Sequence, residues 1–118
     1  MAQVFDGITV LDFTRGMPGG IATMVMSDFG AEVIKVEAPG GEKFRDWPGA
    51  IQWNRGKKSV ILDLKTPDGA EALRRLIRTA DVLIENFRPG SLKKLGFDYE
   101  TVRTWNTQLV YCSITGYG

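Results

Sequence analysis

Short apolar runs rich in β-branched residues alternate with segments of helical spacing, and this alternation restricts the fold more than any other feature. Residues 8–13 (ITVLDF) form the first apolar run and residues 31–37 (AEVIKVE) the second. Between them lie a glycine cluster and residues 21–29, in which Val25 and Phe29 recur at helical spacing. The whole unit is about 30 residues long, the size of a parallel βαβ crossover.

The second half of the chain repeats this alternation. Thr66 is a good N-cap for a helix whose first residue is Pro67. The other predicted elements are strands at residues 59–64, 82–84 and 109–115 and short helices at residues 92–95 and 99–105. We therefore predict an α/β fold, a Rossmann-like three-layer α/β/α sandwich with a mainly parallel sheet. Because such folds usually continue after a strand, we expect this chain to be the front piece of a larger protein.

Residues 38–58 break the pattern. They contain several glycines, two prolines and the tryptophans Trp47 and Trp53, mixed with charged residues. This composition predicts an ordered surface loop with no helix or strand of its own. Long ordered loops are often functional.

The composition excludes several classes of function. Of the 118 residues, 43% are hydrophobic, and the formal net charge is +1. This apolar fraction is too high for a disordered chain, and the charge lacks the basic excess of nucleic-acid-binding modules. No apolar stretch reaches the roughly 18 residues of a membrane span, and the N-terminus does not resemble a signal peptide. We expect one soluble, cytoplasmic domain over residues 1–118 with no nucleic-acid or membrane partner.

Histidine is absent, and Cys112 is the single cysteine. The chain alone therefore cannot form a Ser-His-Asp or Cys-His arrangement or an internal disulfide, and we expect no metal site. Any acid–base chemistry would fall to carboxylates, lysines or tyrosines. We interpret Asp12 as a hydrogen-bonding group at a strand end and Asp28 as a helix-terminal group.

The glycine cluster at residues 16–20 lies between the first strand and the first helix, and Glu37 ends the second strand. This arrangement resembles a dinucleotide-binding fingerprint, in which the acidic residue binds ribose. However, the spacing is G-x-x-G-G rather than G-x-G-x-x-G, and Pro18 removes one backbone donor. We favour a tight strand-to-helix turn, and an NAD-binding domain stays as an alternative.

Two further segments are candidates for anion or ring binding. The basic segment at residues 54–58 (NRGKK) could hold phosphates or form a solvated turn, and we favour the turn. The segment at residues 85–90 (ENFRPG) closes a strand and opens a helix, whose free amides attract anions. Within it, Phe87 could stack on a flat ring such as adenine or fill the core, and both options stay open.

Several stretches together resemble one family. They are residues 6–14, 30–37, 54–60, 62–65, 80–90, 95–96 and 113–118, in family order along essentially the whole chain. The sequence resembles the N-terminal part of the large domain of family III CoA-transferases. This group includes formyl-CoA transferase, carnitine CoA-transferase and the α-methylacyl-CoA racemases.

The resemblance implies a site for a CoA thioester, with coenzyme A as part of the substrate and neither metal nor NAD expected. The residues it assigns to CoA are Leu62, Asp63, Leu64, Lys65, Asn86, Phe87 and Arg88, with Lys94 facing the phosphates, Thr115, Gly116, Tyr117 and Gly118 along the pantetheine arm, and Met17 and Pro18 at the thioester end. Two positions depart from the family. Met17 replaces the glutamine of formyl-CoA transferase, and Ala38 replaces a basic residue that packs against adenine, so Arg45 or another cation would substitute.

The resemblance also implies a reaction. The family's transferases use an aspartate nucleophile that forms a mixed anhydride and releases CoA thiolate, whereas the racemases use a histidine and an aspartate. Both positions lie beyond the residue matching Gly118, so we assign no catalytic residue and expect the chain alone to be inactive. We favour a transferase acting on an acyl-CoA and a carboxylic acid. The alternatives are a racemase fragment and a non-catalytic CoA-binding module. The expected partner is a second copy in an interlocked homodimer, or a complementing C-terminal half.

Overall fold

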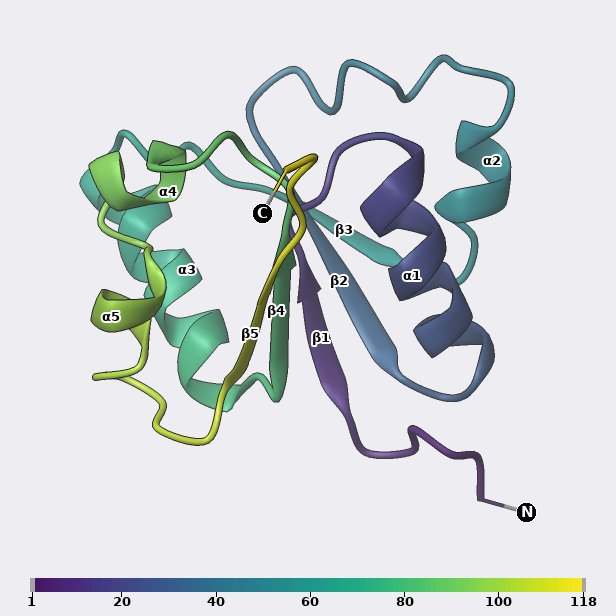
Figure 1. Cartoon of the computed structure of the whole chain (residues 1–118), viewed down its shortest axis with the longest axis horizontal. Coiled ribbons are helices and arrows are strands. Elements are labelled where there is room, and N and C mark those ends of the chain that lie inside the picture. Colours follow the sequence, from purple (N-terminus) through teal and green to yellow (C-terminus); the bar gives the residue numbers. More distant parts are fainter. Residues whose placement is uncertain (1, 118) are drawn as a thin grey trace.

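A five-stranded, fully parallel sheet forms the centre of the computed structural model, which describes residues 2–117 (Figure 1). The strands are β1 (Thr9–Asp12), β2 (Glu32–Glu37), β3 (Lys58–Ile61), β4 (Val82–Glu85) and β5 (Val110–Ser113). Their order across the sheet is β3-β2-β1-β4-β5. The chain therefore builds outward from β1 in one direction and then reverses to place β4 on its other side.

The helices lie on both sides of the sheet (Figure 1). They are α1 (Met17–Asp28), α2 (Ala50–Trp53), α3 (Pro67–Thr79), α4 (Ser91–Lys94) and α5 (Tyr99–Val102). Helices α1 and α2 cover one face, and α3, α4 and α5 lie over the other. The predicted three-layer α/β/α fold with a parallel sheet is confirmed.

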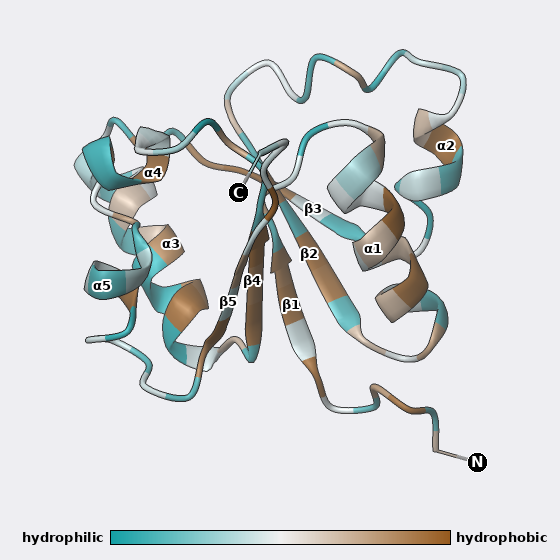
Figure 2. Cartoon of the chain, viewed as in Figure 1, coloured by the Kyte–Doolittle hydropathy of each residue, from teal (hydrophilic) through white to brown (hydrophobic). Residues whose placement is uncertain are grey.

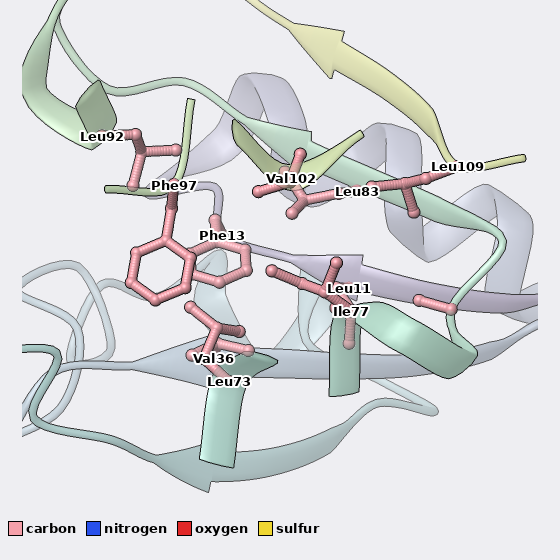
Figure 3. Close-up of a cluster of buried hydrophobic side chains, with 11 residues drawn as sticks. Leu11, Phe13, Val36, Leu73, Ile77, Leu83, Leu92, Phe97, Val102 and Leu109 are labelled. Carbon is pink, nitrogen blue, oxygen red and sulfur yellow. The ribbon is translucent and has the colours of Figure 1, made fainter. Parts of the chain in front are cut away.

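A continuous apolar core fills the space between α3 and the sheet (Figure 3). Leu11 and Leu83 on the strands and Leu73 and Ile77 on α3 are almost completely buried. The helix begins where the sequence predicts, because the Thr66 hydroxyl accepts a hydrogen bond of 3.1 Å from the Gly69 amide. Helix α3 is therefore an ordinary amphipathic helix whose apolar stripe faces the sheet.

The bounds of helix α1 differ from the prediction. It begins at Met17 rather than residue 21, because Pro18 is tolerated in a first helical turn. A Cβ at Gly19 would come within 2.1 Å of the Thr14 side chain, and one at Gly20 within 2.7 Å of the Trp53 side chain. The glycines therefore let the helix approach its neighbours closely, as the favoured strand-to-helix turn requires.

The outer surface of α1 is apolar. Its buried residues are Gly19, Gly20 and Thr23, whereas Val25 is 42% exposed and Phe29, at the helix end, is 51% exposed. Val25 and Phe29, whose spacing predicted the helix, are thus exposed to solvent, and apolar residues make up much of the α1 ribbon (Figure 2).

Two buried charges lie beneath α1. The Asp12 carboxylate accepts hydrogen bonds from the hydroxyls of Thr14 and Thr23, both at 2.6 Å, and forms an ion pair of 2.9 Å with Lys57. Burial raises the pKa of the Asp12 carboxyl, but Lys57, Lys35 and the two hydroxyls outweigh that effect and hold the pKa below its ordinary value. Asp12 is therefore structural, as predicted.

The segment at residues 38–58 differs from the predicted loop because it contains α2. Trp53 of α2 is buried against Gly20, which explains why this one-turn helix forms. The segment is joined to the end of α1 by an ion pair between Arg55 and Asp28. Among residues 2–117, no helix is both long and apolar enough to cross a membrane.

Candidate functional site

A cavity of about 350 Å³ opens at the carboxyl ends of β1, β2, β3 and β4. Its lining residues are Phe13, Thr14, Arg15, Lys35, Val36, Glu37, Ala38, Pro39, Gly41, Glu42, Lys43, Leu62, Asp63, Leu64, Lys65, Phe87 and Leu95. The sheet order reverses between β1 and β4 at this edge. Ligands of open parallel sheets bind at such reversal points, so this cavity is the candidate site.

Five residues expected to contact CoA line this cavity. Leu62, Asp63, Leu64 and Lys65 follow β3, and Phe87 follows β4. The backbone after β3 is fixed, because the Lys65 amide donates to the Asp63 carboxylate at 3.0 Å. The Phe87 ring packs against the core and also lines the cavity, and its stacking on a flat ring stays a prediction.

The remaining expected residues lie outside the cavity lining. All follow the carboxyl ends of strands or lie in the first turns after them: Met17, Pro18, Asn86, Arg88, Lys94, Thr115, Gly116 and Tyr117. Lys94 is exposed, although its neighbour Leu95 does line the cavity. Gly118 lies outside the described residues.

Asn86 connects the two central strands. Its side-chain oxygen accepts a hydrogen bond of 2.8 Å from the Arg15 amide, and its side-chain nitrogen donates one of 2.8 Å to the Arg15 carbonyl. The Arg15 guanidinium lies 4.6 Å from the centre of the Phe87 ring. The sequence analysis missed Arg15, although its position directly after the first strand could have indicated it.

A second network fixes the segment after β2. The Lys35 ammonium forms an ion pair of 2.8 Å with Glu42 and donates to the Thr14 carbonyl at 2.9 Å. The other oxygen of Glu42 accepts a hydrogen bond from the Gly16 amide. Glu42 therefore joins the 38–49 loop to the turn that precedes α1.

Glu37 at the end of β2 is bound within the protein. Its carboxylate accepts hydrogen bonds from Ser59, Arg45 and the Glu42 amide. Burial raises the pKa of the Glu37 carboxyl, but these hydrogen bonds and the charge of Arg45 bring the pKa below its ordinary value. Both oxygens accept hydrogen bonds within the protein, which disfavours the ribose contact of a dinucleotide site.

Three cations that line the cavity have no carboxylate partner within the described residues. Among residues 2–117, Arg15, Lys43 and Lys65 line it and form no ion pair. Arg45, named as a substitute for the missing basic residue at Ala38, is instead paired with Glu37. Lys43 is therefore the cation in this loop that faces the cavity. Apolar walls with unpaired cations suit a ligand that has both apolar and anionic parts.

The basic segment at residues 54–58 forms a structural turn. Arg55 pairs with Asp28, Lys57 with Asp12, and Lys58 with Glu32 at 3.0 Å. None of these cations lines the cavity. Residues 2–117 also contain no cluster of three or more acidic or cysteine side chains placed to hold a metal ion.

Comparison with known proteins connects this geometry to a family. The sequence pattern of CoA-transferase family III matches residues 5–118. The chain is 46% identical, over an alignment of 129 residues, to succinate–glutarate CoA-transferase from Agrobacterium fabrum, covering 96% of this chain and 32% of that protein. It is 41% identical to human succinyl-CoA:glutarate CoA-transferase, and this match covers 96% of this chain and 28% of the human protein. The chain thus spans about a third of the length of the curated relatives it matches.

Solved structures also match this chain over about a third of their own length. The crystal structure of Rv3272 from Mycobacterium tuberculosis superposes with a TM-score of 0.94 at 48% identity, covering 99% of this chain and 33% of that one. A CAIB/BAIF family protein from Brucella suis superposes with a TM-score of 0.92 at 41% identity, and this match covers 100% of this chain and 35% of that one. A short chain dehydrogenase/reductase family protein, with a TM-score of 0.52 at 19% identity, shares the fold alone.

Proposed function

The chain belongs to CoA-transferase family III, and on that premise we propose that its cavity binds CoA in a protein that moves CoA between carboxylic acids. One observation carries the proposal. Residues 62–65 and Phe87, which the family resemblance assigns to CoA, lie in different parts of the sequence yet line one cavity beside the unpaired cations Lys43 and Lys65. An adenine nucleotide with phosphates has the flat apolar and anionic parts that such a lining suits.

In the proposed site, Lys43 and Lys65 face the CoA phosphates, and Phe87 with Leu62 and Leu64 forms the apolar wall. The thioester end lies toward Met17 and Pro18, and Thr115, Gly116 and Tyr117 follow the pantetheine arm. Arg88 and Lys94 lie outside the cavity and act on the part of the ligand that extends beyond it. Asn86 acts by holding the backbone of Arg15.

The proposed chemistry is covalent. An aspartate outside residues 1–118 attacks the thioester carbonyl carbon, the carbon–sulfur bond breaks, and CoA leaves as the thiolate. The acceptor carboxylate then displaces the donor acid from the aspartyl anhydride, and the CoA thiolate attacks the new acyl carbonyl carbon, which releases the aspartate and gives the acceptor's CoA thioester. The transferase names of the relatives support transfer over α-proton racemisation.

The proposal also includes a homodimer and a cytoplasmic location. An apolar outer surface on α1 and α2 supports association with further protein, because contiguous exposed apolar side chains mark interaction sites. Residues 1–118 would then form the first part of the large domain of a longer enzyme.

Calorimetric titration with CoA, with NAD as the control ligand, tests the nucleotide site. We expect CoA to bind, and Lys65→Ala to weaken binding about tenfold through the loss of one charged contact. Lys58→Ala is the matched control, because Lys58 pairs with Glu32 and does not line the cavity. Lys94→Ala tests the outlying phosphate contact in the same assay. Binding of NAD but not CoA would refute the proposal.

A further inference from the structure

Arg15 has a fixed backbone at the centre of the carboxyl edge of the sheet. It follows β1, and the side chain of Asn86, which follows β4, hydrogen-bonds both its amide and its carbonyl at 2.8 Å. Its position therefore depends on both central strands. Only its side chain is left free to respond to a ligand.

Arg15 differs in its ion pairing from the other two arginines that lie over aromatic rings. Arg74 lies 5.1 Å from the centre of the Trp105 ring, and Arg103 lies 5.8 Å from that of Tyr99. Arg74 pairs with Glu71, and Arg103 pairs with Glu100. Arg15 is closer to its ring, at 4.6 Å from Phe87, but forms no ion pair within residues 2–117.

Two of the three acids that line this cavity already have cationic partners. Glu37 and Glu42 line the same cavity but are bound to Arg45 and Lys35 respectively. Asp63 accepts the Lys65 amide. The Arg15 guanidinium is thus an exposed cation that faces a cavity, with a ring beneath it that restricts its orientation.

We propose that Arg15 is an additional ligand-binding residue whose guanidinium pairs with an oxyanion of the molecule in this cavity. The planar fork of donors on arginine matches the geometry of a carboxylate or a phosphate. The identity of the ligand rests on the function proposed above. That function offers two sources of the oxyanion, a phosphate of CoA and the carboxylate of the free acid.

The test uses Arg15→Ala and Arg15→Lys in calorimetric titrations with three probes: CoA, inorganic diphosphate and succinate. We expect Arg15→Ala to weaken binding of at least one probe about tenfold, and Arg15→Lys to recover part of the loss because it keeps the charge but not the fork. Arg103→Ala is the matched control, since Arg103 also lies over a ring but does not line the cavity. Far-UV circular dichroism checks that each variant is folded.

The probes separate the possible results. Weaker CoA and diphosphate binding identifies a phosphate as the partner of Arg15, and weaker succinate binding alone identifies a carboxylate. If wild-type protein binds diphosphate or succinate through Arg15 but does not bind CoA, the proposed function fails and the role of Arg15 stands. If Arg15→Ala binds every probe as wild type does, or wild type binds none of them, the role of Arg15 is refuted.

Discussion

On the α3 face of the sheet, β1 and β2 present Leu11, Phe13 and Val36 to an amphipathic helix, whereas toward α1 the same strands present Asp12 and Lys35. The first face is held by a large apolar core, and its helix is charged on the outside (Figures 2 and 3). The second face combines a smaller apolar cluster around Val10, Val33 and Ile84 with close glycine packing and buried ion pairs, and its helix is apolar on the outside. An outer surface of this kind is typical of a helix that packs against a further layer of protein.

Removing Asp12 should have the largest effect, because the α1 face depends on a buried charge pair. Asp12→Ala leaves the Lys57 ammonium, whose side chain is 2% exposed, without its partner. Breaking a buried pair in this way costs about 3–5 kcal/mol of unfolding free energy. Urea denaturation measures the loss, and a change below about 1 kcal/mol would show that the network contributes little.

Truncating Leu73 tests the apolar face in the same assay. Leu73 is fully buried between α3 and the sheet. Leu73→Ala should cost about 2–5 kcal/mol, from lost burial and the cavity that remains. Unlike Asp12→Ala, it should leave the pH dependence of stability unchanged. A changed pH dependence would mean that the two faces are coupled.

Acidification should act on the α1 face. The pKa of the Asp12 carboxyl is lower in the folded protein than its ordinary value of 3.8, so the folded state favours the ionised form. Its stabilisation is present above that ordinary value and is lost as the pH falls through the folded pKa. We expect the unfolding free energy to decrease as the pH falls below about 4. Asp12→Asn should flatten this slope, and an equal slope in both proteins would contradict the assignment.

The smallest change in stability is expected on the outer apolar surface. Ile51 on α2 is 83% exposed. Ile51→Ser should change unfolding free energy by no more than about 0.5 kcal/mol. It should, however, reduce self-association in sedimentation velocity experiments, whereas Arg75→Ser on the outer face of α3 should not. Equal self-association of the two variants would show that the apolar surface has no role in assembly.

The sequence predicted the elements that depend on local chemistry. The Thr66 cap, the amphipathic α3 and the short apolar strands were all located correctly, because capping, helical spacing and β-branched runs are properties of neighbouring residues. The sequence did not predict the orientation of α1, because its apolar residues indicate a helix but do not show which side of it faces the sheet. The small residues Gly19 and Gly20 face inward because the side chains of Thr14 and Trp53 approach the helix too closely for larger ones.

For the candidate site, the sequence supplied Leu62, Leu64 and Phe87 through family motifs, but it did not supply Arg15 or Lys43. Arg15 could have been inferred from its position directly after the first strand, but nothing local distinguishes Lys43 from Arg45 or Lys58, which are paired with carboxylates. The sequence by itself therefore determined the parallel α/β fold and the family. The fold follows from local patterns of helices and strands, and the family follows from several motifs in a fixed order. Only the tertiary structure decided which charges neutralise one another and which are left facing the cavity, because ion pairing depends on side chains brought together from distant parts of the chain.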